Sequence, residues 1–225
     1  MTAMISPAPR KARRALLSQY DVVLLEGITW ETYERLRGDL DDAGSHVKIV
    51  YDDGRMAVMA PLWIHDRNKT LIRRMIEMLT FELDMPIVSC GSVTWKRKDL
   101  RKGLEPDEGY YIQHAPQIGG RTDVDLERDP PPDLVLEIEA TRSPVPKFPV
   151  YAALRVPEIW HYDGKTIRCL HLRRGGKYQP ADSSLAFPFL RPAELMRFLD
   201  MLPAKDENGM LKAFRDWVRT LRKKK

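Results

Sequence analysis

The sequence of 225 residues lacks the features that would assign it to several special classes of protein. No apolar run approaches the ~20 residues of a membrane-spanning helix, and no apolar core of signal-peptide type follows the basic N-terminal residues. The two cysteines, Cys90 and Cys169, belong to no CxxC pair and no zinc-type spacing, so both are expected to be buried or neutral thiols. The sequence has no internal repeat and no low-complexity segment outside its tails. These absences predict a cytoplasmic protein.

The composition is that of a soluble globular protein, with 43% hydrophobic and 31% charged residues. The formal net charge of +5 fits a polyanionic partner, although part of it comes from basic tails at residues 10–14 and 222–225. We expect three parts of the chain: a flexible basic arm over 1–17, one domain over 18–190, and C-terminal helices with a basic tail over 191–225.

Hydrophobic periodicity and turn signals predict both helices and strands. A helix is expected over 29–36 with Thr29 as its N-cap, and a hairpin over 46–60 around an Asp-Gly turn. Apolar residues at helical spacing predict a long helix over 66–83. The other expected elements are strands over 87–89, 92–96, 109–112 and 134–139, a helix over 150–154, a hairpin over 158–172, and helices over 193–201 and 210–221. This order predicts an α/β fold with a mixed sheet.

Glu137 and Glu139 stand in the run Leu134-Val-Leu-Glu-Ile-Glu, which is typical of a strand buried on both faces. A buried carboxylate is costly unless it is hydrogen-bonded, paired or bound to a cation. Residues two apart point to the same side of a strand, so these two acids repel each other unless a cation lies nearby. The alternative is a strand with one solvated face, and the local sequence leaves both interpretations open.

Four further residues have both a functional and an ordinary interpretation. Asp107 and Asp133 each precede a predicted strand, where carboxylates commonly cap turns, but acids on adjacent strands also hold divalent cations. Lys147 is either a surface lysine or a group that positions a metal-activated water and stabilises charge at phosphorus. His65, before the long helix, is either a helix-start contact or a base or outer-shell ligand of the site.

The segment Trp95-Lys-Arg-Lys-Asp-Leu-Arg-Lys102 is densely basic and lies just before Asp107 in the sequence. Basic residues beside an aromatic ring suit a nucleic-acid backbone, although solvated loops have a similar composition. Its place next to the candidate acids favours nucleic-acid contacts. The residues expected to make them are Lys96, Arg97, Lys98, Arg101 and Lys102.

Several of these stretches together resemble one known family. They are residues 91–108, 131–141 and 151–160, preceded by the hairpin 52–61 and His65. The combination resembles the Uma-type endonuclease family of the PD-(D/E)XK superfamily, and the similarity runs from about residue 29 to residue 172. The resemblance implies a restriction-endonuclease-like α/β fold, with a mixed central sheet flanked by helices and Mg²⁺, or Mn²⁺ in its place, at the sheet edge.

The resemblance also implies roles for individual residues. Asp107 matches the motif aspartate, Glu137 matches the (D/E) position, and the backbone carbonyl of Ile138 is a further metal ligand. The superfamily has a lysine where this chain has Glu139, and Lys147 matches the basic residue that the following helix supplies instead. His65 is the nearest match to the acidic helix position of the superfamily.

Three functional hypotheses follow. The first is a Mg²⁺-dependent endonuclease that hydrolyses DNA by a metal-activated water. The second is a nuclease fold that binds nucleic acid or a protein partner without cleavage, because Glu139 replaces the motif lysine and prolines surround Lys147. The third is self-association, as a homodimer, through C-terminal helices around 195–202 and 210–221.

Overall fold

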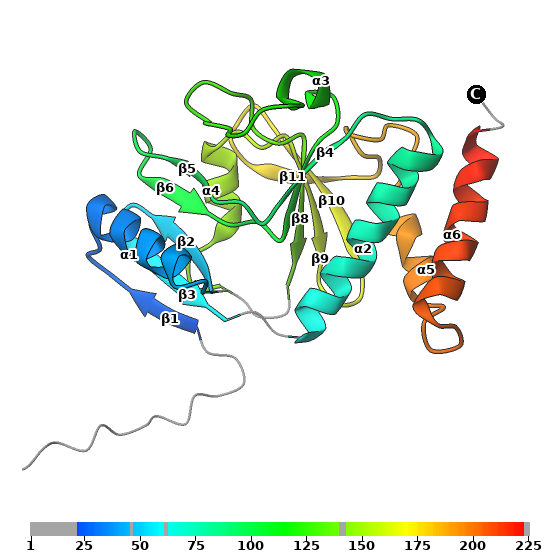
Figure 1. Cartoon of the computed structure of the whole chain (residues 1–225), viewed down its shortest axis with the longest axis horizontal. Helices are drawn as coiled ribbons and strands as arrows, with labels where there is room; N and C mark the ends of the chain where they lie inside the picture. The colour runs from blue at the N-terminus through cyan, green and yellow to red at the C-terminus, as the bar shows by residue number, and fades with distance from the viewer. Residues whose placement is uncertain (1–21, 46, 61–62, 140–142, 223–225) are drawn as a thin grey trace, which may run out of the picture.

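The computed structural model describes residues 22–45, 47–60, 63–139 and 143–222 (Figure 1). The predicted arm over 1–17, His46 of the predicted first hairpin, and residues 223–225 of the predicted basic tail lie outside the described residues.

The strands form two sheets. The five-stranded sheet has the order β1-β3-β2-β6-β5, and its strands are β1 (Val22–Leu25), β2 (Lys48–Asp52), β3 (Arg55–Met59), β5 (Trp95–Arg97) and β6 (Lys102–Leu104). The six-stranded sheet has the order β11-β10-β9-β8-β7-β4, and its strands are β4 (Val88–Gly91), β7 (Glu108–Tyr111), β8 (Leu134–Ile138), β9 (Glu158–Tyr162), β10 (Ile167–Leu172) and β11 (Tyr178–Ala181).

The helices lie around these sheets (Figure 1). They are α1 (Trp30–Asp42), α2 (Trp63–Glu82), α3 (Ala115–Ile118), α4 (Lys147–Ala153), the 3₁₀ helix η1 (Pro192–Leu195), α5 (Met196–Leu199) and α6 (Glu207–Arg222). In Figure 1, α2, α5 and α6 stand on one side of the six-stranded sheet and α4 on the other.

The six-stranded sheet is mixed, because β8 and β9 are parallel while its other strand pairs are antiparallel. It separates two hydrophobic cores. Leu136 and Trp160 belong to the core that α2 and α6 cover, whereas Val135 and Ile159 belong to the core that contains α4. A strand with apolar side chains on both faces is buried on both faces, as its sequence indicates. The prediction of an α/β fold with a mixed sheet flanked by helices is confirmed.

Local sequence signals account for several elements. Asp53 and Gly54 both have positive φ, 43° and 91°, which is the conformation that a two-residue turn between β2 and β3 requires. The hydroxyl of Thr29 accepts a hydrogen bond from the backbone N–H of Thr32 at 3.1 Å and so caps α1. The predicted hairpin and N-cap are therefore confirmed, although α1 continues to Asp42.

Other elements differ from the sequence prediction. The short elements β1, β6, β11 and α3 were not predicted, because runs of three or four residues carry little periodicity. Helix α4 begins at Lys147 and not at 150. Pro146 is its N-cap and Pro149 lies in its first turn, where a missing N–H costs no helical hydrogen bond.

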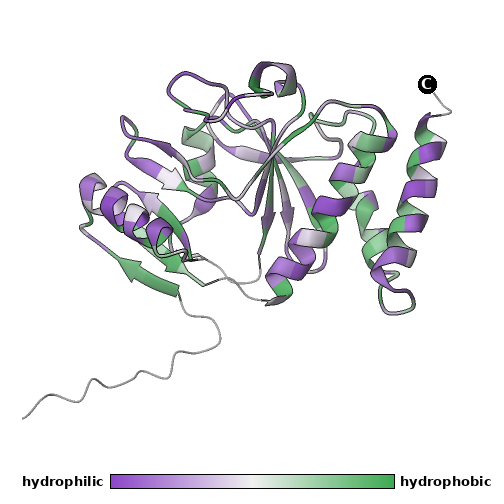
Figure 2. Ribbon diagram, viewed as in Figure 1, coloured by the Kyte–Doolittle hydropathy of each residue, from purple (hydrophilic) through white to green (hydrophobic). Residues whose placement is uncertain are grey.

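The C-terminal helices complete the core that α2 covers. Phe198 of α5 and Phe214 and Val218 of α6 are buried in one cluster with Leu71 and Met75 of α2. Figure 2 shows green and purple residues turned to different sides of α6, as in an amphipathic helix with one buried face. Because this apolar face is used within the chain, the structure gives the predicted homodimer no support. The domain boundary at residue 190 stays a prediction.

One further property concerns membranes. Within the described residues, no helix combines the length and the apolar character needed to cross a bilayer.

Candidate active site

Asp107 lies directly before β7, and its side chain is completely buried. One carboxylate oxygen, Oδ1, accepts a hydrogen bond from the ammonium group of Lys48 on β2. The other, Oδ2, lies 2.9 Å from Nε2 of His65 on α2 and accepts the backbone N–H of Ile138 at 2.6 Å. The carboxylate therefore joins elements of both sheets and one helix.

The surroundings of Asp107 keep it ionised. Burial alone would raise its pKa, but the charges of Lys48 and Lys147 and the hydrogen bond with His65 hold the pKa well below its usual range. An ionised carboxylate can only accept, so Nε2 of His65 carries a hydrogen and donates it. The other ring nitrogen, Nδ1, is buried without a hydrogen-bond partner among the described residues and lies 3.7 Å from Asp66 Oδ1.

Glu137 is the fourth of the five residues of β8 and has an exposed fraction of 3%. The ammonium group of Lys147 donates to its Oε2 at 2.5 Å, and the hydroxyl of Tyr151 donates to its Oε1. Lys147 and Tyr151 are four residues apart on α4, so they share one helix face. The interpretation of Glu137 as an exposed surface acid is excluded.

The same contacts fix the protonation of the partners. Burial lowers the pKa of Lys147, but Glu137 and Asp107 raise it above its ordinary value. Burial and the neighbouring Glu137 raise the pKa of Tyr151 well above its ordinary value. Lys147 therefore stays a cation and Tyr151 a neutral phenol, so both act as hydrogen-bond donors.

The two carboxylates belong to one site. In the antiparallel pair of β7 and β8, Glu108 lies opposite Leu136, so one step further along each strand leads to Asp107 and Glu137. The hydrogen bond from Ile138 N–H to Asp107 shows that the two strands stay close beyond the paired residues. Asp107, Glu137, Lys147 and His65, which the sequence identified separately, therefore lie together at the end of the six-stranded sheet where β7 begins and β8 ends.

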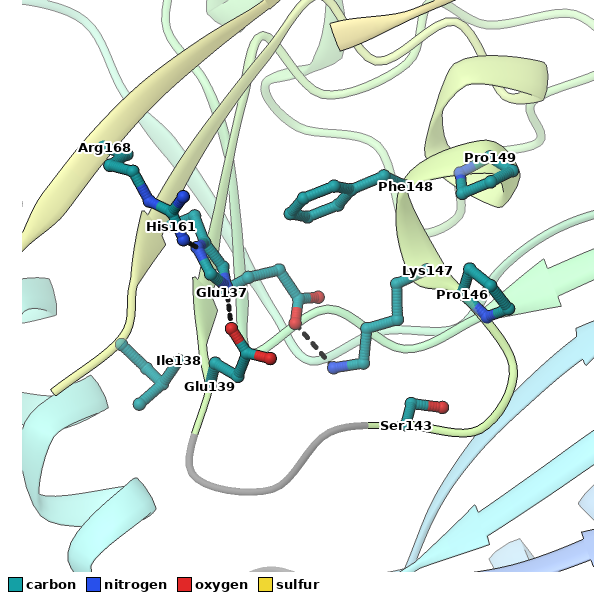
Figure 3. Close-up of a pocket in the computed structure, with 10 residues that line it drawn as sticks. All are labelled: Glu137, Ile138, Glu139, Ser143, Pro146, Lys147, Phe148, Pro149, His161 and Arg168. Atoms are coloured by element: carbon teal, nitrogen blue, oxygen red, sulfur yellow. Dashed lines mark hydrogen bonds and ion pairs between the residues drawn. The ribbon is translucent and has the colours of Figure 1, made fainter. Parts of the chain in front are cut away.

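A cavity of about 350 Å³ opens beside this end of the sheet (Figure 3). The Glu137–Lys147 ion pair forms one part of its wall, and Glu139, His161 and Arg168 form another. The Arg168 guanidinium lies 3.1 Å from His161 Nδ1, and His161 Nε2 lies 3.0 Å from Glu139 Oε2. Arginine can only donate, so Nδ1 accepts and Nε2 donates to Glu139. Burial lowers the pKa of His161, which agrees with a neutral ring.

The donor set fits a hard divalent cation. Asp107, Glu137 and the backbone carbonyl of Ile138 offer the oxygen ligands that Mg²⁺ prefers. The charges of Lys48 and Lys147 balance those of the two carboxylates, so a divalent cation would leave a positive site that a phosphodiester can neutralise. A bound cation and an anionic ligand would therefore favour each other.

The rival acid Asp133 serves a structural role. Its Oδ2 accepts the backbone N–H groups of Ile112 and His114, at 2.7 and 2.9 Å, and its Oδ1 lies 2.5 Å from His114 Nδ1. These bonds close the turn after β7, which is the capping role that acids commonly have next to strands.

The basic segment lies in the hairpin of β5 and β6, away from the two acids. Lys102 pairs with Asp52, at the opposite end of β2 from Lys48 and about 13 Å along the strand. Most basic side chains of the segment form ion pairs with acidic residues. The pairs are Lys96 with Glu34 at 2.6 Å, Arg97 with Asp99 at 2.5 Å, Arg101 with Asp53 at 3.2 Å, and Lys102 with Asp52. The role of this segment, Lys98 included, in binding nucleic acid stays a prediction.

Sequence reasoning missed several residues of the site. Lys48 is the first residue of the apolar strand β2. Only the packing of the two sheets against each other brings its side chain to Asp107. Tyr151 was detectable in principle, because it lies four residues after Lys147, but the helix was expected to begin later. His161 and Arg168 become neighbours through strand register, where Arg168 lies opposite His161 and His161 beside Glu137.

Comparison with known families places this site within a family match. The model of the Uma2 family, described as "putative restriction endonuclease", matches residues 30–201 of the 225 in the chain. The match includes every residue around the two carboxylates. No curated protein shows significant similarity to the chain.

Proposed function

Because the chain belongs to the Uma2 family of restriction-endonuclease-type proteins, we propose that it is a Mg²⁺-dependent endonuclease that hydrolyses phosphodiester bonds of DNA. The observation that carries the proposal is the approach of Asp107 to the strand of Glu137, with a 2.6 Å hydrogen bond from Ile138 N–H to Asp107. Two buried carboxylates, a backbone carbonyl and a charged lysine at one end of the central strands are the groups that metal-assisted phosphodiester hydrolysis requires.

The metal ligands in this proposal are Asp107, Glu137 and the carbonyl of Ile138, with Mg²⁺ as the resident ion and Mn²⁺ as a substitute. When bound, Mg²⁺ would lower the pKa of a water molecule and offset charge that develops on the phosphate oxygens.

Lys147 acts in this proposal as a donor and not as a base. It is 17% exposed, is held by Glu137 and has a raised pKa, so its ammonium group keeps its proton. From this position it can hold a phosphate oxygen or the attacking water against phosphorus, and it stabilises negative charge as the bond to phosphorus forms. Its place in α4 supplies the cation that superfamily members carry at the position of Glu139.

His65 acts in this proposal through Asp107. Its Nε2–H group donates to Asp107 Oδ2, and the Ile138 N–H group donates to the same oxygen. These two bonds hold Oδ2 and fix the orientation of the carboxylate, which is the usual role of groups behind a metal ligand.

The test is cleavage of supercoiled and linear duplex DNA by the purified chain in Mg²⁺, in Mn²⁺ and in EDTA. We expect cleavage only with the metals, and losses of at least about 100-fold in Asp107→Asn and Lys147→Met. Glu127→Gln, which changes an exposed acid, is the matched control and should cleave at the rate of the unmodified chain. Undiminished cleavage by folded Asp107→Asn would exclude the assigned site.

One observation favours a second candidate function, binding of nucleic acid without cleavage. Lys48 and Lys147 each pair with one of the two carboxylates that would hold the cation. If these ion pairs persist in the presence of millimolar Mg²⁺, the site cannot take up the metal. Salt-sensitive duplex binding with no heat of Mg²⁺ binding and no cleavage would then establish the binding module.

A further inference from the structure

A second group of ligand-type side chains lies on the other face of the six-stranded sheet. Glu158 of β9 and Cys169 and His171 of β10 are all buried, with exposed fractions of 0%, 4% and 6%. One ligand atom from each lies within 4.8 Å of the others. The described residues hold no other such group of three or more His, Cys, Asp or Glu side chains. We refer to these three residues as the β9–β10 cluster.

Strand pairing explains why the three side chains meet. His171 lies directly opposite Glu158, and Cys169 lies opposite Trp160, which is two residues from Glu158. Residues two apart share a face of the sheet, so the cluster and Trp160 point to the same side. Cys169 and Trp160 belong to the core that α2 and α6 cover, whereas Glu137 lies on the face of α4. The cluster is thus separate from the proposed nuclease site.

The spacing of the cluster is that of a metal coordination shell. Cys169 Sγ lies 3.2 Å from Glu158 Oε1, 3.4 Å from His171 Nε2 and 3.5 Å from the backbone carbonyl oxygen of Ser183. With Zn–S near 2.3 Å and Zn–N near 2.0 Å, ligand atoms of a tetrahedral zinc site are about 3.5 Å apart. A thiol has one hydrogen, so Cys169 can donate to only one of these three neighbours. Burial and the nearby Glu158 raise the pKa of the Cys169 thiol, so without a cation it stays protonated and is a weak hydrogen-bond donor.

The groups around Glu158 hold its carboxylate in place. Its Oε2 accepts the backbone N–H groups of Leu185 and Ala186, both at 2.8 Å, and its Oε1 accepts Nε1–H of Trp160 at 2.6 Å. Hydrogen bonds to a ligating carboxylate are a regular feature of metal centres, and Oε1, which accepts one N–H group, has a second lone pair for an ion. One carboxylate and one thiolate also balance the charge of a divalent cation, as a buried site requires.

We propose that the β9–β10 cluster is a structural zinc site, with Glu158, Cys169 and His171 as ligands and the Ser183 carbonyl as the nearest candidate for the fourth. A thiolate and an imidazole select zinc over Mg²⁺, which takes oxygen ligands. The site fastens the β9–β10 hairpin to the loop of residues 183–187, and so fixes the sheet that carries Glu137 on its other face. The sequence gives no zinc motif because the ligands come together through strand register.

The experiment measures zinc in the untagged full chain, expressed with added zinc and passed through gel filtration. We expect about one zinc per chain by mass spectrometry of metals, and a loss of most of it in Cys169→Ser and in His171→Gln. Matched controls are Cys90→Ser and His114→Gln, which change the same residue types outside the cluster and should keep the zinc. Magnesium at millimolar concentration should displace none of it.

Two further measurements keep the proposal testable if a variant fails to fold. Cobalt in place of zinc should give a thiolate-to-metal charge-transfer band in the unmodified chain. Removal of zinc by a strong chelator should lower the Tm by about 5–10 °C, and zinc should restore it. Folded unmodified chain that takes up no zinc, or variants that retain it fully, would overturn the proposal, since the cluster would then be hydrogen-bonded without metal. Neither result bears on DNA cleavage.

Discussion

Glu137 and Glu158 are buried glutamates on neighbouring strands of one sheet, and their partners differ in kind. Glu137 is bound by two side chains of α4, the ammonium of Lys147 and the hydroxyl of Tyr151. Glu158 is bound mainly by rigid donors, the backbone N–H groups of Leu185 and Ala186 and the indole of Trp160. The ammonium group of a lysine side chain can move away from its carboxylate and be replaced by another cation, or it can also bind a substrate. Backbone N–H groups cannot move away from the carboxylate in this way. Burial alone therefore does not identify a functional acid, but the nature of its partners does.

The largest expected effect is on stability and concerns Glu158. Replacement by alanine leaves the Leu185 and Ala186 N–H groups and the Trp160 indole without their acceptor, and should lower the free energy of unfolding by about 3 kcal/mol or more. Urea unfolding followed by circular dichroism measures this, with Glu127→Ala as an exposed control that should change it little. A loss no larger than that of the control would contradict the structural role of Glu158.

The next effect separates activity from stability at Glu137. In Glu137→Gln the side chain keeps its shape and still accepts from Tyr151, but it loses the charge that balances Lys147 and binds a cation. We expect DNA cleavage to fall by about 100-fold, with a smaller loss of unfolding free energy than in Glu158→Ala. Rates under single-turnover conditions and urea unfolding on the same preparation test both parts. Equal stability losses in the two variants would remove the distinction between the two glutamates.

Lys48 tests whether an ammonium group competes with the cation. Its side chain is 13% exposed and binds Asp107, a proposed metal ligand. In Lys48→Met, Oδ1 of Asp107 has no ammonium partner, so the affinity for Mg²⁺ should rise by about tenfold in calorimetric titration. Lys69→Met, which alters a lysine paired with Asp66 at 3.3 Å on α2, is the control. Unchanged or weaker Mg²⁺ binding in Lys48→Met would show that Lys48 supports the metal site instead.

The smallest effect is expected in the basic hairpin. Arg97 is already paired with Asp99, and the hairpin lies at the far end of β2 from the site. Arg97→Ala should weaken duplex binding by less than about threefold at moderate salt, as a single screened surface charge would. Fluorescence anisotropy at several salt concentrations measures this. A loss of tenfold or more would make the hairpin a principal nucleic-acid contact, as the sequence analysis predicted.

The parts of the fold that depend on local sequence patterns could be predicted from the sequence. The Asp53-Gly54 turn, the N-cap at Thr29 and the apolar stripe of α2 could all be predicted, because each arises within a few consecutive residues. The approach of Asp107 to Glu137 was predicted through the family resemblance, and in the structure Asp107 accepts the backbone N–H of Ile138, the residue after Glu137.

The remaining parts depend on contacts between segments far apart in the sequence. Lys48 reaches Asp107 only because the five-stranded and six-stranded sheets pack against each other through a shared hydrophobic core. The β9–β10 cluster and the Arg168–His161–Glu139 chain depend on strand register, where a shift of one residue would turn each side chain to the other face. No composition or spacing signal reports a register in advance.

The prolines at the start of α4 have a consequence for Lys147. Pro146 and Pro149 restrict the backbone on both sides of this lysine in the unfolded chain as well as in the folded one. Little conformational entropy of the main chain then remains to be lost when the ammonium group is placed beside Glu137. The ammonium group of Lys147 is thus attached to a restricted backbone. Any adjustment to an incoming phosphate must come from the lysine side chain alone.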